Sequence, residues 1–232
     1  MNNKSQVFRD DVLNIFTDAS IKPLQVKNTW DGCSGAVSVI NEDKEDYDRR
    51  VVIIRNCTNN IAELTAIEVG VDLAIDNIGK FSRINLFSDS KISVLGLRDW
   101  IWNWMNSSRD MRYMTTSSGT PIKNLNIILN IINKILMIDP NLSQFNIYHC
   151  KGHALGKGEL IQKTFYEVNK LKISIEDALE LGKYNDIVDN LTRDTLYHYP
   201  EGGLEMSVVP FSIHPTNMSL YKEIIGRRSF RW

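Results

Sequence analysis

The chain has 232 residues and a formal net charge of −1, with 43% hydrophobic and 24% charged residues. These values are ordinary for a globular protein that buries a core, and the net charge alone does not indicate a nucleic-acid-binding protein. There is no apolar run that could be a signal peptide or span a membrane, and three cysteines without paired spacing favour free thiols over a disulfide framework. We therefore expect a cytoplasmic protein.

Short runs of β-branched and aromatic residues predict five strands. They are expected at residues 12–18, 35–40, 50–56, 84–89 and 145–150. Apolar residues at helical spacing predict helices between and after the strands. These are expected at residues 60–78, 95–105 and 121–136, twice within 154–184 with the second beginning at Ser174, and again at 183–196. This order indicates an α/β fold with a five-stranded mixed sheet flanked by helices.

Two of the predicted strands end in an aspartate followed by small residues. Asp18 ends the first strand in the motif FTDAS, and Asp89 ends the fourth in the motif FSDS. Ligand sites in open α/β sheets form beyond the carboxyl ends of strands, so both aspartates are well placed to face a ligand. Aspartate and serine also favour strand-ending turns, which gives each motif a purely structural alternative.

Glu63 lies on the apolar side of its predicted helix. At about 100° per residue, the other polar residues gather on one face, while Glu63 projects to the opposite face with Ile67 and Val71. A carboxylate facing the core is costly unless it is paired, protonated or bound to a metal. A buried salt bridge or a frayed first helical turn would also accommodate it. With Asp18 and Asp89 nearby, a cation would be needed to keep all three groups ionised.

Asp189 is a weaker candidate on physical grounds. Its predicted helix carries apolar residues on one side, and Asp189 lies on the other side with Asp186 and Arg193. A solvated surface position is the default for an acidic residue in such a pattern. Periodicity alone therefore does not place Asp189 in a site.

Five short motifs, in order, resemble the bacterial-type ribonuclease H family of the ribonuclease H-like superfamily. They are FTDAS at 16–20, TNN followed by AEL at 58–64, FSDS at 87–90, KGHA at 151–154 and NDIVDNL at 185–191. Each motif is weak by itself, but five in the family's order and in matching structural contexts are specific. The resemblance runs from about residue 12 to residue 193, with an interruption at 154–184.

The resemblance implies an endoribonuclease that hydrolyses the RNA strand of RNA–DNA hybrids and leaves a 3′-hydroxyl and a 5′-phosphate. The metal ligands that it implies are Asp18, Glu63, Asp89 and Asp189. They would hold two Mg²⁺ ions roughly 3.5–4 Å apart, with Mn²⁺ as an alternative, because hard cations prefer oxygen ligands. The resemblance also makes His153 a catalytic residue that assists proton movement or product release, with a plain loop histidine as the alternative.

Substrate contacts are implied at two places. WIWNWM and the later TPIKN resemble the family's basic protrusion, and residues 90–135 around them carry six basic and two acidic residues. The residues implied to meet the hybrid there are Arg98, Trp100, Trp102, Trp104 and Lys123. Those implied beside Glu63 are Thr58, Asn59 and Asn60, whose polar groups could hold a DNA phosphate or read the RNA 2′-hydroxyl. We expect at least one tryptophan to belong to the core, and helix capping by Thr58 or an asparagine is equally consistent.

Some features depart from the family pattern. The first acidic residue is followed by Ala19, where the family usually has glycine. The turn before the second strand is reduced to residues 31–35, after an unusual segment at 21–30. Because this loop normally carries contacts to the RNA, those contacts cannot be transferred to this chain.

The largest departure is about thirty extra residues before the last acidic motif. We therefore expect a ribonuclease H domain over residues 1–198, with a helical insert at 154–184, and a C-terminal extension of unknown structure at 199–232. The lysines of the insert could form a lid or extend the substrate channel. Packing on the domain as a surface elaboration is the alternative that we favour.

Three competing interpretations remain. A zinc site at His149, Cys150 and His153 would lack a regular fourth ligand. A hybrid-binding module without catalysis would not need the acidic set. A related metal-dependent nuclease that acts on DNA is a further alternative, because a fold does not determine the substrate. We expect a monomer that binds an RNA–DNA hybrid and no membrane.

Overall fold

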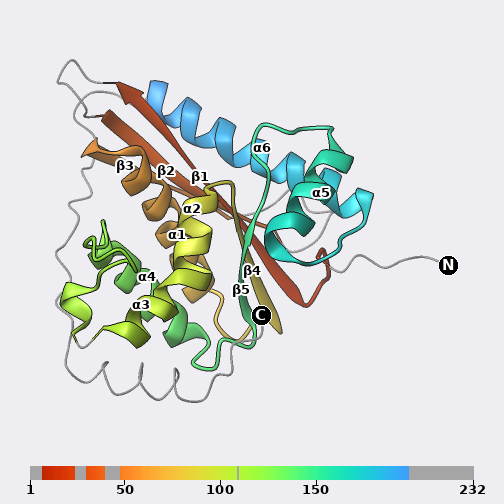
Figure 1. The fold of residues 1–232 in the computed structure, drawn as a ribbon. Helices are drawn as coiled ribbons and strands as arrows, with labels where there is room; N and C mark the ends of the chain where they lie inside the picture. Colours follow the sequence, from red (N-terminus) through yellow and green to blue (C-terminus); the bar gives the residue numbers. More distant parts are fainter. Residues whose placement is uncertain (1–6, 24–29, 40–47, 109, 199–232) are drawn as a thin grey trace.

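The computed structural model describes residues 7–23, 30–39, 48–108 and 110–198, so the predicted extension at 199–232 lies outside the described residues. Within these ranges, five strands form one sheet in the order β3-β2-β1-β4-β5. The strands are β1 (Val12–Pro23), β2 (Trp30–Val39), β3 (Arg49–Cys57), β4 (Arg83–Ser88) and β5 (Phe145–His149). β1 pairs antiparallel with β2 and parallel with β4, which confirms the predicted mixed sheet (Figure 1).

Helices cover both faces of the sheet (Figure 1). One face carries α1 (Asn59–Ile75), α4 (Leu125–Ile138) and a helical run made of α2 (Lys91–Leu95), a π-helical turn (Gly96–Trp100) and α3 (Ile101–Ser107), which a 3₁₀ turn (Met111–Tyr113) follows. The other face carries α5 (Gly158–Asn169) and α6 (Ile175–His198). Strand side chains alternate between the faces, so Ile15 joins the first apolar core and Phe16 the second. Among the described residues, no helix is both long and apolar enough to cross a membrane.

The first two strands form a longer hairpin than the sequence predicted. β1 runs to Pro23, which still pairs with Trp30 at the start of β2. Residues 31–35 therefore lie inside β2, and their prediction as a turn is wrong. Gly35 has a packing role instead, because an added Cβ would lie 2.6 Å from the Cγ2 atom of Thr192 on α6. The glycine lets the helix approach the sheet closely.

The start of the helix predicted at 121–136 is also corrected. α4 begins at Leu125, four residues later than Pro121. Pro121 instead forms an isolated β-bridge with Thr115, and Asn124 has a left-handed backbone with φ of 57°. This backbone turn separates the preceding loop from the helix.

The segment predicted as an insert contains α5 and the first part of α6. Ser174 caps α6 as predicted, because the Asp177 N–H donates to Ser174 Oγ over 2.9 Å. The helix then continues without interruption through residues 183–196, which were predicted as a separate helix. Gly182 lets α5 pack closely on this long helix, since an added Cβ would lie 2.6 Å from Ile161 Cδ1.

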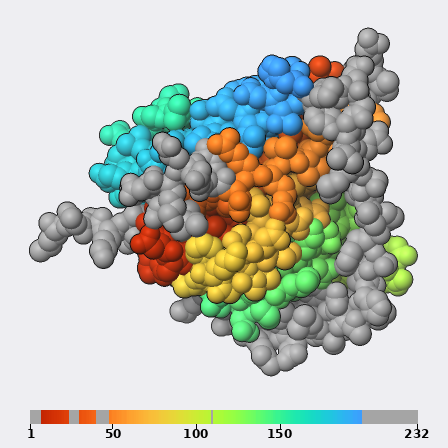
Figure 2. Space-filling model, turned by 180° about the vertical axis from the view of Figure 1, so that it is seen from behind, coloured from red at the N-terminus to blue at the C-terminus, as the bar shows by residue number. Residues whose placement is uncertain are grey.

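The insert buries aromatic side chains against the sheet. Phe165 of α5 is 1% exposed, and its ring centroid lies 6.4 Å from that of Phe87 and 5.6 Å from that of Tyr148. Tyr184 of α6 packs on Phe16 with 5.3 Å between centroids. Seen from behind, the atoms of α6 (blue) adjoin those of the insert (cyan) along one side of the molecule (Figure 2). The insert thus contributes to the second core of the fold.

Phe165→Ala is expected to lower the free energy of unfolding by about 3–4 kcal/mol, because it deletes a buried ring and leaves a cavity beside Phe87. Tyr166→Ala on the same helix is the matched control, since Tyr166 is 48% exposed. It is expected to cost less than about 1 kcal/mol. Urea unfolding followed by circular dichroism measures both values. Small and equal losses would contradict close packing of the insert and favour a mobile lid.

Candidate active site

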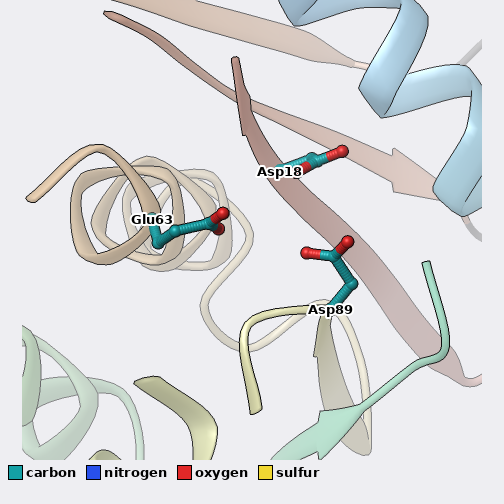
Figure 3. Close-up of side chains that lie close together, drawn as sticks. All are labelled: Asp18, Glu63 and Asp89. Carbon is teal, nitrogen blue, oxygen red and sulfur yellow. The ribbon is translucent and has the colours of Figure 1, made fainter. Parts of the chain in front are cut away.

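Three acidic side chains from different elements meet at one end of the sheet. Asp18 comes from β1, Glu63 from α1, and Asp89 from the residue after β4. A carboxylate oxygen of each lies within 4.8 Å of the others. Figure 3 shows the three side chains lying close together, with Glu63 extending from α1 toward the two aspartates. Among the described residues, this is the group of acidic, histidine and cysteine side chains that has the geometry to hold a metal ion.

The separation of β1 from β4 makes room for these groups. The last parallel pair between the two strands is Thr17 with Ser88, and the residues that follow are Asp18 and Asp89. Contrary to the prediction, β1 does not end at Asp18, which continues the hairpin opposite Gly35. The site still lies beyond the carboxyl end of β4, as ligand sites in α/β sheets do.

Glu63 faces the core, as its helical position predicted. It is 9% exposed, and among the described residues no donor reaches its Oε2 atom. Burial, and then the charges of Asp89 and Asp18, raise the pKa of Glu63 to about 9. The helix start is well formed, because the Ile61 N–H donates to the Oγ1 atom of the capping Thr58 over 3.3 Å. A frayed first turn therefore does not explain this carboxylate.

The two aspartates share this environment. Burial, and then the charge of Asp89, raise the pKa of Asp18, although the Ala19 N–H donates to Asp18 Oδ1 over 2.7 Å. Burial also raises the pKa of Asp89, an effect that the nearby His153 and Lys151 oppose. Three buried carboxyl groups this close can all be ionised only if a cation offsets their charge. Their all-oxygen donor set suits a hard divalent cation.

Asp189 lies beside the three-residue group but is not part of it. It is 9% exposed, so the surface position that its helix pattern indicated is wrong. The reason is that α6 packs along β1, which turns this side of the helix toward Asp18 and lets the Asp189 charge raise the pKa of Asp18. The Oδ2 atom of Asp189 accepts a hydrogen bond from Arg193 Nη1 over 2.9 Å and lies 3.8 Å from His153 Nδ1.

Two polar residues that join β1 to α6 were missed in the sequence. The Oγ atom of Ser20 and the Oγ1 atom of Thr192 lie 3.0 Å apart within hydrogen-bond distance. Thr192 Oγ1 also donates to the carbonyl oxygen of Asp189 over 3.0 Å. Because Ser20 follows Asp18 by two residues, this link sets the distance between the first and the fourth acidic residue. No periodic signal marks such a pair, since it depends on how the helix docks.

The loop after β5 packs directly on Asp89. Gly152 has no room for a side chain, because an added Cβ would lie 2.1 Å from Asp89 Oδ2. His153 follows with a left-handed backbone (φ 51°) and a side chain that is 78% exposed. His149 and Cys150 are buried and, among the described residues, do not form a metal-ligand group with His153. The zinc alternative is therefore wrong.

Several of the residues predicted to bind substrate line one groove. Trp100 and Trp104 lie on the same side of the helical run, with ring centroids 6.1 Å apart, and border a groove of about 280 Å³. The groove extends to Asn60 at the start of α1 and to Lys123. Asn59 is exposed next to Asn60. The two predicted contact regions therefore adjoin each other and lead toward Glu63.

Two predicted contacts are not placed to meet a nucleic acid. Trp102 is 3% exposed and belongs to the first core, so the contact predicted for it is wrong. The side chain of Arg98 is 10% exposed, and its guanidinium pairs with Asp99 and donates to Asn169. Both residues lie two positions from Trp100, and a helix turns residues two apart to different sides. The structure thus contradicts the phosphate contact predicted for Arg98.

Comparisons with known proteins match most of this chain. The RNase H family profile matches residues 10–162. Ribonuclease H of Ruthia magnifica subsp. Calyptogena magnifica is 30% identical over 134 residues, which are 56% of this chain and 80% of that protein. The profile match ends within α5, so Asp189 lies beyond it.

Solved structures share the fold at low sequence identity. LC9-RNase H1, a type 1 RNase H with the type 2 active-site motif, is 17% identical with a TM-score of 0.53, over 96% of this chain and 84% of that chain. The foamy viral protease-reverse transcriptase in complex with RNA/DNA hybrid is 14% identical with a TM-score of 0.51, over 85% of this chain and 22% of that chain. These likenesses concern the fold alone.

Glu63→Gln is expected to stabilise the metal-free protein by about 2 kcal/mol near pH 8, because it removes a buried carboxyl whose Oε2 atom has no hydrogen-bond donor among the described residues. The folded-state pKa of about 9 lies above the ordinary value of 4.5. The unfolded chain therefore ionises first, and the stability of the parent protein falls as the pH rises from about 4.5 to about 9. Thermal unfolding in EDTA across this range measures the difference, with the exposed Glu176→Gln as control. A variant no more stable than the parent near pH 8 would contradict the argument.

Proposed function

This chain belongs to the RNase H family, and we propose that it is an endoribonuclease that cuts the RNA strand of RNA–DNA hybrids, leaving a 3′-hydroxyl and a 5′-phosphate. Family membership implies hydrolysis of RNA in such hybrids. The observation that carries the proposal is the buried acidic group in which no described donor reaches Glu63 Oε2. A site that only bound a polyanion would place cations there instead. One protein of the same fold was solved with an RNA/DNA hybrid, which agrees with this substrate.

We assign the acidic group as the ligands of divalent cations, with Asp189 as the fourth ligand. Carboxylate oxygens fit Mg²⁺ or Mn²⁺ better than a soft metal, and one of them, Glu63 Oε2, is buried without a donor from the described part of the chain. Two such ions, when bound, supply activation of the attacking water and charge stabilisation at the leaving 3′-oxygen. The protein's part is to hold the oxygens in place. The Ala19 N–H fixes Oδ1 of Asp18, and the close backbone of Gly152 limits the position of Asp89.

His153 is the proposed proton-transfer group. Its ring lies 3.8 Å from Asp189 on one side and is largely open to solvent on the other. An imidazole can accept a proton on one ring nitrogen and donate one from the other, so this side chain can pass a proton between the site and bulk water. In this position it would serve the departing 3′-oxygen or help release the product.

We propose that the groove of Trp100 and Trp104 receives the DNA strand. Indole faces can pack on sugars and bases, and Lys123 at the groove can meet a phosphate. Asn60 connects this groove with the acidic site, because it precedes Glu63 by one helical turn. Asn59 and Asn60 are the proposed readers of the 2′-hydroxyl, which only the RNA strand carries.

We further propose that residues 1–198 act as one RNase H domain that includes the insert and works as a monomer. The support is the second apolar core, in which Phe16 and Phe87 from the sheet pack with Phe165 and Tyr184 from α5 and α6. A domain that lost the insert would expose this core to water.

The first test is cleavage of a labelled RNA–DNA hybrid with Mg²⁺, Mn²⁺ or EDTA. Internal cuts in the RNA strand are expected with either metal and not with EDTA. Asp89→Asn is expected to reduce the rate by at least about 1,000-fold, because it removes a ligand charge. The exposed Glu176→Gln is expected to cut at the parent rate. Hybrid binding without cutting would favour a binding module, and cutting of duplex DNA alone would favour a DNA nuclease.

Trp100→Ala is expected to raise the KM for the hybrid about tenfold and to change kcat less than about twofold, because stacking on one aromatic ring contributes about 1–3 kcal/mol. Trp100 is 39% exposed, so the loss of stability should be small. The control is Tyr113→Ala, which removes an exposed aromatic side chain that does not line the groove. Equal KM values for the two variants would remove the groove from the proposed substrate path.

A further inference from the structure

The last residue of β5 has an unusual partner. β5 is an edge strand, and its neighbour β4 already binds the next residue, because the Cys150 N–H donates to the Ser88 carbonyl over 3.0 Å. The peptide groups of His149 are bound by the side chain of Asn169, the last residue of α5. The His149 N–H donates to Asn169 Oδ1 over 3.0 Å, and Asn169 Nδ2 donates to the His149 carbonyl over 2.8 Å. The amide of Asn169 thus replaces the peptide group of a further strand.

The same side chain also binds the helical run that carries the groove tryptophans. Arg98 Nη1 donates to Asn169 Oδ1 over 2.9 Å, and Arg98 Nη2 donates to the Val168 carbonyl over 3.1 Å. A cation at this end of α5 also interacts favourably with the helix dipole. Asp99 pairs with the guanidinium, so the buried charge is balanced. One residue of the insert therefore joins β5 to the π-helical turn.

The two residues that Asn169 binds, His149 and Arg98, are each close in sequence to residues of the acidic site or the substrate groove. From His149 the chain runs three residues to Gly152, whose backbone contacts Asp89 so closely that no Cβ would fit. His153 is the next residue. In the other direction, Arg98 lies two residues before Trp100 in the π-helical turn. A shift of β5 at His149 would therefore change the space around Asp89 and the position of the proton-transfer group.

We propose that Asn169 is a positioning residue, through which the insert braces the acidic site and the substrate groove against each other. This proposal rests on the proposed function for its effect on turnover. The brace itself is a property of the fold. It gives the insert a second role beside covering the core. Hydrogen bonds that are bidentate and partly buried constrain direction as well as distance, which suits a group that must orient a loop.

The test compares Asn169→Leu, which has a similar volume but no hydrogen bonds, with Asn169→Asp, which keeps the acceptor but loses the donor. Glu167→Gln, an exposed change on the same helix, is the control. Hydrogen exchange of the His149–His153 amides, Mn²⁺ affinity by calorimetry, and kcat and KM for the hybrid are measured on each full-length protein.

Asn169→Leu is expected to speed exchange of the His149 amide about fivefold, because it removes the part-buried hydrogen bond that this amide donates. It should also weaken Mn²⁺ binding about fivefold and lower kcat about tenfold with KM within about twofold. Asn169→Asp should change amide exchange, Mn²⁺ affinity and kcat in the same directions but by smaller factors. If the leucine variant does not fold, the aspartate variant tests the proposal. The Glu167→Gln control should match the parent.

Faster exchange with unchanged Mn²⁺ affinity and unchanged kcat would overturn the proposal, because Asn169 would then stabilise the fold without positioning the site. Unchanged exchange would overturn it as well, since the bonds would not constrain β5. If the parent protein does not cut hybrids at all, the proposed function fails. Exchange and Mn²⁺ affinity then still decide whether Asn169 braces the acidic group.

Discussion

Mutual repulsion among buried carboxylates is the constraint on which the rest of this structure depends. Carboxylate oxygens of Asp18, Glu63 and Asp89 approach within 4.8 Å of one another, and Asp18 and Glu63 are buried. Water screens the repulsion between like charges only weakly in such a site. If the three carboxylates were carried by flexible chain segments, they would therefore move apart. Each is instead carried by a rigid element or by the residue directly after one. The separation of β1 from β4 and the docking of α1 bring them together.

A layer of aromatic side chains next to the acidic site shows how the insert helps to hold the carboxylates together. Phe16 and Phe87 each precede an aspartate of the acidic site by two residues, and their rings stack with 4.9 Å between centroids. Phe165 and Tyr184 cover them from α5 and α6. Without these two side chains, water would reach Phe16 and Phe87 below the acidic site. It would then screen the repulsion between the carboxylates, which is what favours binding of a divalent cation. The second core thus connects the packing of an unusual insert with the proposed chemistry.

Sequence patterns correctly predicted the features of the fold and the site that depend on local periodicity. The five strands follow from β-branched runs, and the inward direction of Glu63 follows from its helical position. Features that depend on how distant elements dock were not predicted. Asp189 turned out to be buried because α6 packs along β1, and Arg98 proved to be bound inside the protein because α5, seventy residues later, supplies its partner. The hairpin extension to Pro23 likewise depends on pairing between strands.

The fourth acidic residue, Asp189, differs from the other three in the positive charge that balances its carboxylate. Asp189 has a cationic partner on its own helix, Arg193, whose charge also lowers the pKa of Asp18. Lys151 opposes the raised pKa of Asp89 from a greater distance, without an ion pair among the described residues. These cations offset part of the negative charge at the rim, whereas no described donor reaches Glu63 Oε2 in the interior. The unbalanced charge is therefore concentrated where the three carboxylates converge, which is the position that best suits a divalent cation.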